Sequence, residues 1–245
     1  MYRSLDAAKI VETCRALHSR VGERFPGSGL SKVASELFSV SEHAAEFSEW
    51  LSKPHLPLRA MAGLGIVAVV GVVAGAIASV KVKPTFSSVS EVLQGSDAAL
   101  NEVVFLGIVI IFFITLETRL KRRRALKALH VLRSIAHIID MHQLTKDPER
   151  ITGARPAIEP GAKRPLSPAE LTRYLDFCSD LLALISKIAA LYVQRFDDPV
   201  TLSAVNEVEN LTNGLSRKIW QKIMILDRIM APAGAPPPGK AIGGV

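Results

Sequence analysis

The chain has 245 residues, of which 49% are hydrophobic and 22% charged, with a formal net charge of +7. Its positive mean hydropathy is unusual for a water-soluble protein with so many charges and indicates that part of the chain lies in lipid. The composition excludes a disordered or collagen-like chain, and two cysteines without a spacing pattern exclude a disulfide scaffold.

Residues 1–57 are predicted to form a cytosolic helical hairpin. Apolar residues recur every three or four positions from Ala7 to Val21 and again from Leu30 to Leu51, as on one face of a helix. The sequence FPGSG separates the two runs, and Ser28 is expected to cap the second helix. We do not predict a phosphate loop there, because the spacing differs from GxxxxGK[ST] and no strand precedes it.

Residues 58–80 are predicted to form the first transmembrane helix. The run from Ala60 to Val80 holds no charge and is about 31 Å long as a helix, which matches the hydrocarbon core of a bilayer. Small residues repeat along it at multiples of four positions and let helix backbones approach closely: Gly63, Gly71, Gly75 and Ser79. Their partner is either the second span of this chain or a neighbouring subunit.

Residues 81–97 are predicted to be a short external loop and residues 98–118 the second transmembrane helix. Asn101 and Glu102 form a polar pair near its outer end. Their shallow depth favours an interfacial helix end, and the alternative is an ion path lined by Glu102 from several copies.

Residues 119–143 are predicted to be a cytosolic extension that continues the second span as one long helix. Its basic residues account for the whole net charge, which excludes a broad basic surface for nucleic acid. The first of them follow the span directly and are expected to contact anionic lipid headgroups: Arg119, Lys121, Arg122, Arg123 and Arg124. Basic residues that flank a span favour its cytoplasmic side. Their position here predicts a multi-pass protein of the inner (plasma) membrane with both termini in the cytoplasm.

His130 and His137 share one face of this extension, and Asp140 follows three residues later. Two histidines and one carboxylate are an incomplete ligand set for a structural metal ion. We therefore predict no metal site.

Residues 144–166 are predicted to be a linker rich in proline and glycine, residues 167–230 a C-terminal cytosolic helical hairpin, and residues 231–245 a disordered tail. Ser167-Pro168-Ala169-Glu170 is a capping box. The helix that follows has two adjacent apolar stripes, which indicates packing against more than one neighbour. Cys14 and Cys178 lie on apolar helix faces and are expected to be reduced thiols.

The sequence thus predicts an all-α membrane protein with a two-helix transmembrane hairpin, cytosolic helical hairpins and a long helix that continues the second span. No catalytic motif is present, and we predict neither enzymatic activity nor a cofactor. The predicted function is that of a membrane scaffold or anchor whose cytosolic helices self-assemble or bind a partner in a membrane complex. The alternative is an oligomeric ion channel or pore-forming effector.

Overall fold

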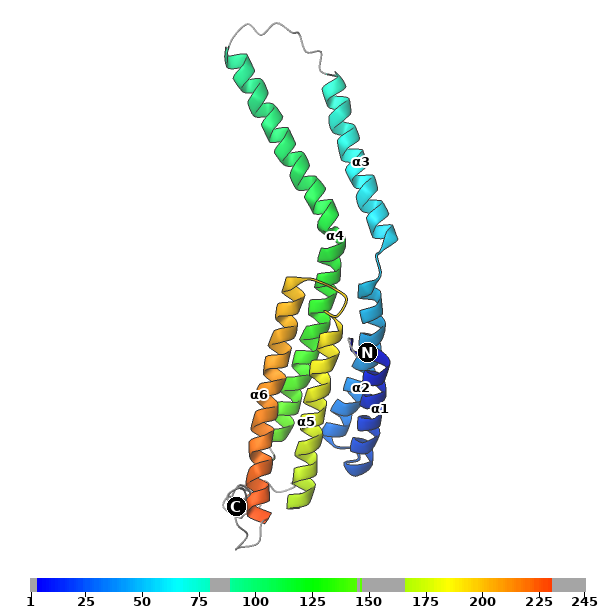
Figure 1. Cartoon of the computed structure of the whole chain (residues 1–245), viewed down its shortest axis with the longest axis vertical. Coiled ribbons are helices and arrows are strands. Elements are labelled where there is room, and N and C mark those ends of the chain that lie inside the picture. Colours follow the sequence, from blue (N-terminus) through cyan, green and yellow to red (C-terminus); the bar gives the residue numbers. More distant parts are fainter. Residues whose placement is uncertain (1–3, 80–88, 145, 147–165, 231–245) are drawn as a thin grey trace, which may run out of the picture. The chain divides into compact units, whose positions relative to one another are not determined.

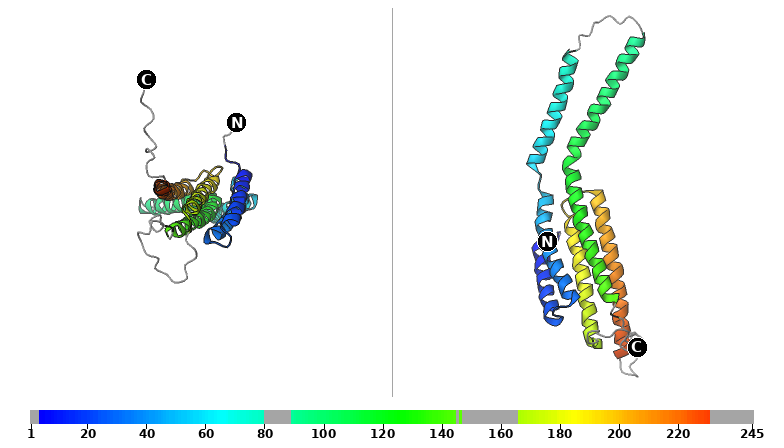
Figure 2. Two further views of the ribbon diagram at one scale, coloured as in Figure 1. Left: turned by 90° about the horizontal axis from the view of Figure 1, so that it is seen from below. Right: turned by 180° about the vertical axis from the view of Figure 1, so that it is seen from behind.

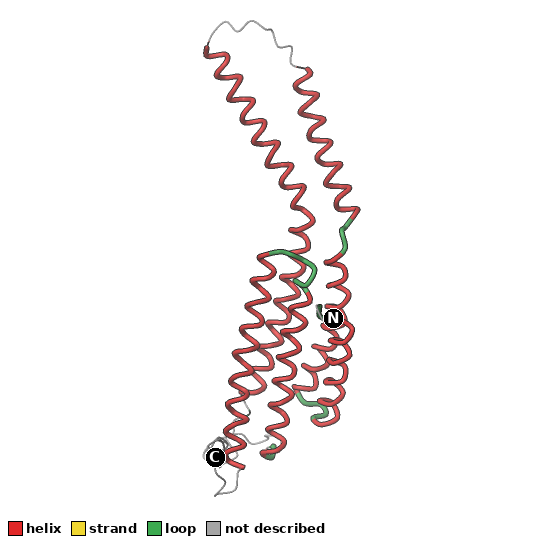
Figure 3. Tube along the Cα trace, viewed as in Figure 1, coloured by secondary structure: helices red, strands yellow, loops and turns green. Residues whose placement is uncertain are grey.

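A computed structural model describes residues 4–79, 89–144, 146 and 166–230. This part of the chain consists of helices and short loops and holds no strand (Figure 3), so the all-helical prediction is confirmed. The helices are α1 (Ala7–Arg24), α2 (Gly29–Ser52), α3 (Leu56–Ser79), α4 (Val89–Leu144), α5 (Pro168–Leu191) and α6 (Pro199–Met230). Residues 81–88 of the predicted external loop, nearly all of the predicted linker and the predicted tail lie outside the described residues.

The chain divides into two compact units. The first unit combines Met1–Trp50 with Leu126–Val245, and the second unit is Leu51–Ala125. Helices α2 and α4 each contribute to both units, because the boundaries fall within them.

Helix α5 is central to the packing of the first unit. It packs most extensively against α6 and also against α1, and it lies between them in two views (Figures 1 and 2). Its two predicted apolar stripes are buried. A helix with neighbours on two sides needs two such stripes, which explains this doubled face.

Helices α4 and α6 each bury an apolar face in the first unit. Leu129, Leu132 and Ile139 of α4 and Val205 of α6 are buried. Ile138 and Met230 are each 42% exposed. Ile138 lies at the edge of the buried face of α4, and Met230 is the last residue of α6, so each has fewer neighbours than the centre of its face.

Local side-chain bonds fix where several helices begin. The Asp6 carboxylate accepts from the backbone N–H groups of Ala8 and Lys9 at the start of α1. The Ser31 N–H donates to Ser28 Oγ at 3.1 Å, as predicted for the start of α2. The predicted capping box of Ser167 and Glu170 is formed at the start of α5. These bonds satisfy backbone donors that have no partner inside the helix.

The second unit contains α3 and the first part of α4. Both are long and apolar enough to cross a membrane, and none of the residues in their most apolar windows is buried. Leu64 and Val72 of α3 are each 73% exposed. Helix α4 begins at Val89, ahead of the predicted start at residue 98, so the last residues of the predicted external loop are helical.

Candidate functional sites

The junction between α2 and α3 is held by two side chains of α4. Glu117 Oε1 accepts a hydrogen bond from the His55 N–H at 3.2 Å, and Glu117 Oε2 accepts one from Arg59 Nε at 2.7 Å. His55 directly precedes α3, and Arg59 lies in its first turns. The carboxylate therefore lies at the N-terminal end of α3, where the helix dipole favours negative charge.

Lys121 contacts the C-terminal end of α2, as Glu117 contacts the N-terminal end of α3. Its side chain is buried, with the whole residue 7% exposed. The ammonium donates to the carbonyl oxygens of Leu51 at 3.0 Å and Lys53 at 2.8 Å, and it forms an ion pair with Glu117 Oε1 at 2.9 Å. A positive group thus caps the C-terminal end of α2, the end that the helix dipole makes negative.

Together these residues form a reciprocal cap, by which we mean Glu117 and Lys121 with Arg59, the His55 N–H and the carbonyl groups of Leu51 and Lys53. One acidic and one basic residue, a single turn apart on α4, each stabilise one of two adjoining helix ends. Local sequence patterns do not predict this cap, and contact of Lys121 with lipid headgroups stays a prediction. A signal for the cap is the Glu117–Lys121 pair at i,i+4.

The other predicted headgroup residues are more exposed than Lys121. Arg119, Arg123 and Arg124 are exposed, and Arg122 is half-buried. The Arg119 guanidinium lies over the Phe112 ring, 5.5 Å from its centroid, an arrangement suited to a side chain at a membrane surface. Headgroup contact by these arginines stays a prediction.

Helix α3 contacts α4 at a glycine outside the predicted small-residue set. A Cβ built on Gly65 would lie 2.7 Å from Cε1 and Cζ of Phe113, whereas a Cβ on Gly63 or Gly71 meets no described atom within 4 Å. The half-buried residues of α3 lie on the Gly65 side of the helix: Leu58, Ala62, Gly65, Ile66, Val69 and Val73. Gly63 and Gly71 are exposed, and at 100° per residue they lie on the side of α3 away from α4. A Cβ on Gly75 likewise meets no described atom, while Ser79 ends α3 and its side chain is not described.

The predicted polar pair and the histidine face lie on the surface of α4. Asn101 and Glu102 are exposed. His130 and His137 are exposed as well, and the Asp140 carboxylate accepts from Gln143 Nε2 at 2.6 Å. Within the described ranges no group of three potential metal ligands occurs.

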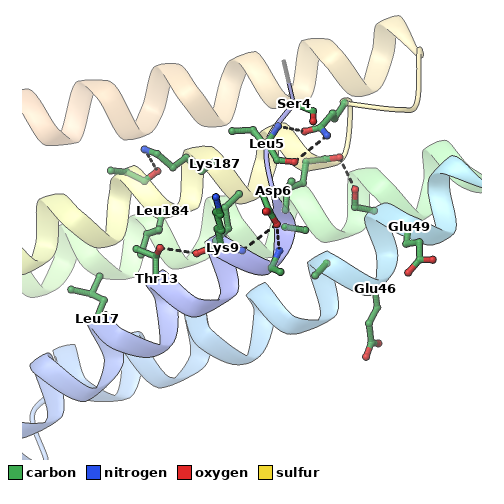
Figure 4. Close-up of a pocket in the computed structure, with 18 of the residues that line it drawn as sticks. Ser4, Leu5, Asp6, Lys9, Thr13, Leu17, Glu46, Glu49, Leu184 and Lys187 are labelled. Atoms are coloured by element: carbon green, nitrogen blue, oxygen red, sulfur yellow. Dashed lines mark hydrogen bonds between the residues drawn. The ribbon is translucent and has the colours of Figure 1, made fainter. Parts of the chain in front are cut away.

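A groove of about 1350 Å³ lies in the first unit between α1, α2 and α5 (Figure 4). The Leu5 N–H donates to Gln194 Oε1 at 3.0 Å, and Gln194 Nε2 donates to the Leu5 carbonyl at 3.2 Å, so one end is bridged. Its charged residues balance: Lys9, Arg20, Lys187 and Arg195 against Asp6, Glu46, Glu49 and Asp180. Balanced charge selects neither an anionic nor a cationic ligand.

Both cysteines are buried and unpaired with each other. Burial raises the pKa of the Cys178 thiol to about 12, against a smaller lowering by Lys222. Burial also raises the pKa of Cys14, which a hydrogen bond with Ser41 opposes. Because only the thiolate is nucleophilic, neither residue is suited to nucleophilic catalysis.

Comparisons of the chain with protein-family models, with curated proteins and with solved structures find no match. We therefore infer function from the geometry alone.

Proposed function

We propose that the chain is an integral protein of the inner membrane, anchored by α3 and the first part of α4. Two apolar helices whose side chains remain exposed support this proposal, because a large exposed apolar surface needs lipid or a partner to cover it. The arginines after the second predicted span favour a cytoplasmic location for both termini.

Within this membrane the proposed role is non-enzymatic. The anchor brings copies of the chain together and thereby gathers their helical bundles at the cytoplasmic surface as a scaffold. The observation that carries this proposal is the arrangement of glycines on α3. Phe113 covers Gly65 on the side toward α4, while Gly63 and Gly71 are exposed on the other side. Because helices in lipid associate through small residues, this exposed side suits contact with a second copy.

The mass of the purified particle in nanodiscs tests the proposal. We expect the wild-type particle to contain more than one copy, and Gly71→Leu to shift it toward the monomer, since a leucine there keeps the two backbones apart. Gly107→Leu is the matched control, because it makes the same change on α4, where a Cβ also meets no described atom within 4 Å. A wild-type particle with one copy would refute self-assembly.

A further inference from the structure

The exposed surface of α2 carries more acidic than basic side chains within the first unit, although Lys32 and His43 are exposed there as well. Glu36, Glu42 and Glu46 are all exposed. Glu42 Oε1 is 3.8 Å from Arg15 Nη2, and the Glu42 side chain stays 47% exposed in this pair. The three carboxylates span ten residues, or about 15 Å of helix.

The exposed face of α4 in the same unit carries basic side chains. Lys127, His130 and His137 are exposed, and steps of three and seven residues place them on one side of the helix. No acidic residue occurs between Glu117 and Asp140. This face offers one permanent positive charge and imidazole N–H donors.

These two faces share one register. Helices α2 and α4 are antiparallel in the first unit (Figures 1 and 2), and the His142 ring lies against Gly29, so these two residues mark one level of the bundle. Each helix rises 1.5 Å per residue away from that level. Glu36 is therefore level with His137, Glu42 with His130 and Glu46 with Lys127, each to within about 3 Å along the axis.

We propose that a second copy of this chain docks here, with the α2 carboxylates of one copy facing Lys127, His130 and His137 of the other. This inference rests on the proposed function, which brings two copies of the chain together. A rotation about an axis parallel to α2 and α4 of the first unit keeps every residue at its level, so side chains that are level within one chain are also level between copies.

A two-fold axis parallel to these helices forms the contact twice, since each copy presents its α2 to the α4 of its partner. Exposed charge pairs set the register and the choice of partner more than the affinity. The glycine contact in the membrane supplies close packing, and the α2–α4 contact selects the orientation of the cytosolic helices.

Two charge-reversal variants test this contact. One is Glu42→Lys/Glu46→Lys, and the other is Lys127→Glu/His130→Glu. Each variant opposes like charges in its own homodimer, so we expect self-association to weaken roughly tenfold. Energy transfer between two fluorescent tags in phosphatidylcholine vesicles measures association without anionic lipid. Glu12→Lys/Glu23→Lys, at two exposed positions of α1, is the matched control and should associate as the wild type does.

Mixing the two reversed variants is the decisive experiment. Their heterodimer again places opposite charges at both contacts, so association should return to the wild-type level. If both variants associate as the wild type does, or if the mixture stays weak, the docking is wrong while self-assembly stands. Weakening of the α4 variant alone would show that this face of α4 meets a surface of the second copy other than α2, and it too would overturn the proposal. A monomeric wild type would refute the proposed function itself.

Discussion

At the start of α2, Gly29 lies directly beneath the imidazole ring of His142. A Cβ built on Gly29 would be 2.8 Å from Nε2 and 2.9 Å from Nδ1, closer than real Cβ contacts come. Gly27, two residues earlier, is glycine for a different reason, since its φ of 65° lies in the left-handed region that side chains disfavour. The sequence predicts a turn at FPGSG, but it does not reveal that His142 covers Gly29.

Gly29→Ala is expected to lower the free energy of unfolding by about 1–3 kcal/mol, the usual cost of overpacking. Thermal unfolding followed by circular dichroism measures this. Gly214→Ala is the control, because a Cβ there meets no described atom within 4 Å, and it should stabilise α6 by about 0.5–1 kcal/mol. The double variant Gly29→Ala/His142→Ala should regain part of the loss. Equal effects of Gly29→Ala and Gly214→Ala would contradict the close approach of His142.

At the scale of elements, the reciprocal cap explains how the chain changes direction between α2 and α3. Prolines at positions 54 and 57 remove backbone donors around the break. Glu117 and Lys121 then match the dipoles of the two helix ends. The spacing of this pair on α4 is visible in the sequence, but the helix ends it contacts lie 58 to 70 positions earlier, so local patterns do not predict the contact.

The charge-swapped variant Glu117→Lys/Lys121→Glu tests this cap. It keeps an ion pair on α4 but places an ammonium against the N–H of His55 and a carboxylate against the carbonyls of Leu51 and Lys53. We expect it to destabilise the protein by about 2 kcal/mol or more, since buried polar groups lose their partners. Unfolding in nanodiscs is the measurement, and Arg123→Met, at an exposed position, is the control. If the swap is as stable as the wild type, the ion pair alone matters and the capping interpretation is wrong.

At the scale of the whole molecule, the two units differ in the exposure of their large apolar side chains. Leucines of the first unit such as Leu175 and Leu182 are fully buried, whereas Leu64 in the second unit is 73% exposed. The first unit therefore buries most of its large apolar side chains against its own helices, although Trp220 on α6 is 62% exposed. The proposed function places the apolar surface of the second unit in lipid.

Membranes washed with alkaline carbonate are expected to retain the chain, because two lipid-embedded spans resist extraction. Reporter tags on the two termini should be accessible from the same, cytoplasmic side. A charged residue placed on α3, as in Val67→Arg, costs about 2.5–3.5 kcal/mol near mid-bilayer and should reduce insertion. Release of the wild type by carbonate, or tags on opposite sides, would refute the proposed anchoring.

Apart from residues 89–97 of α4, local sequence patterns predict the helices and the buried face of each helix in the first unit. These properties follow from periodicity and from caps such as Ser28 and Ser167, which need only neighbouring residues. The side of α3 that faces α4 is known only from the folded arrangement. That helix is apolar on every side, so no polar face marks its orientation, and the position of Phe113 against Gly65 does. The burial of Lys121 was likewise decided by helix ends distant in sequence, because charge alone does not distinguish a capping lysine from one at a lipid surface.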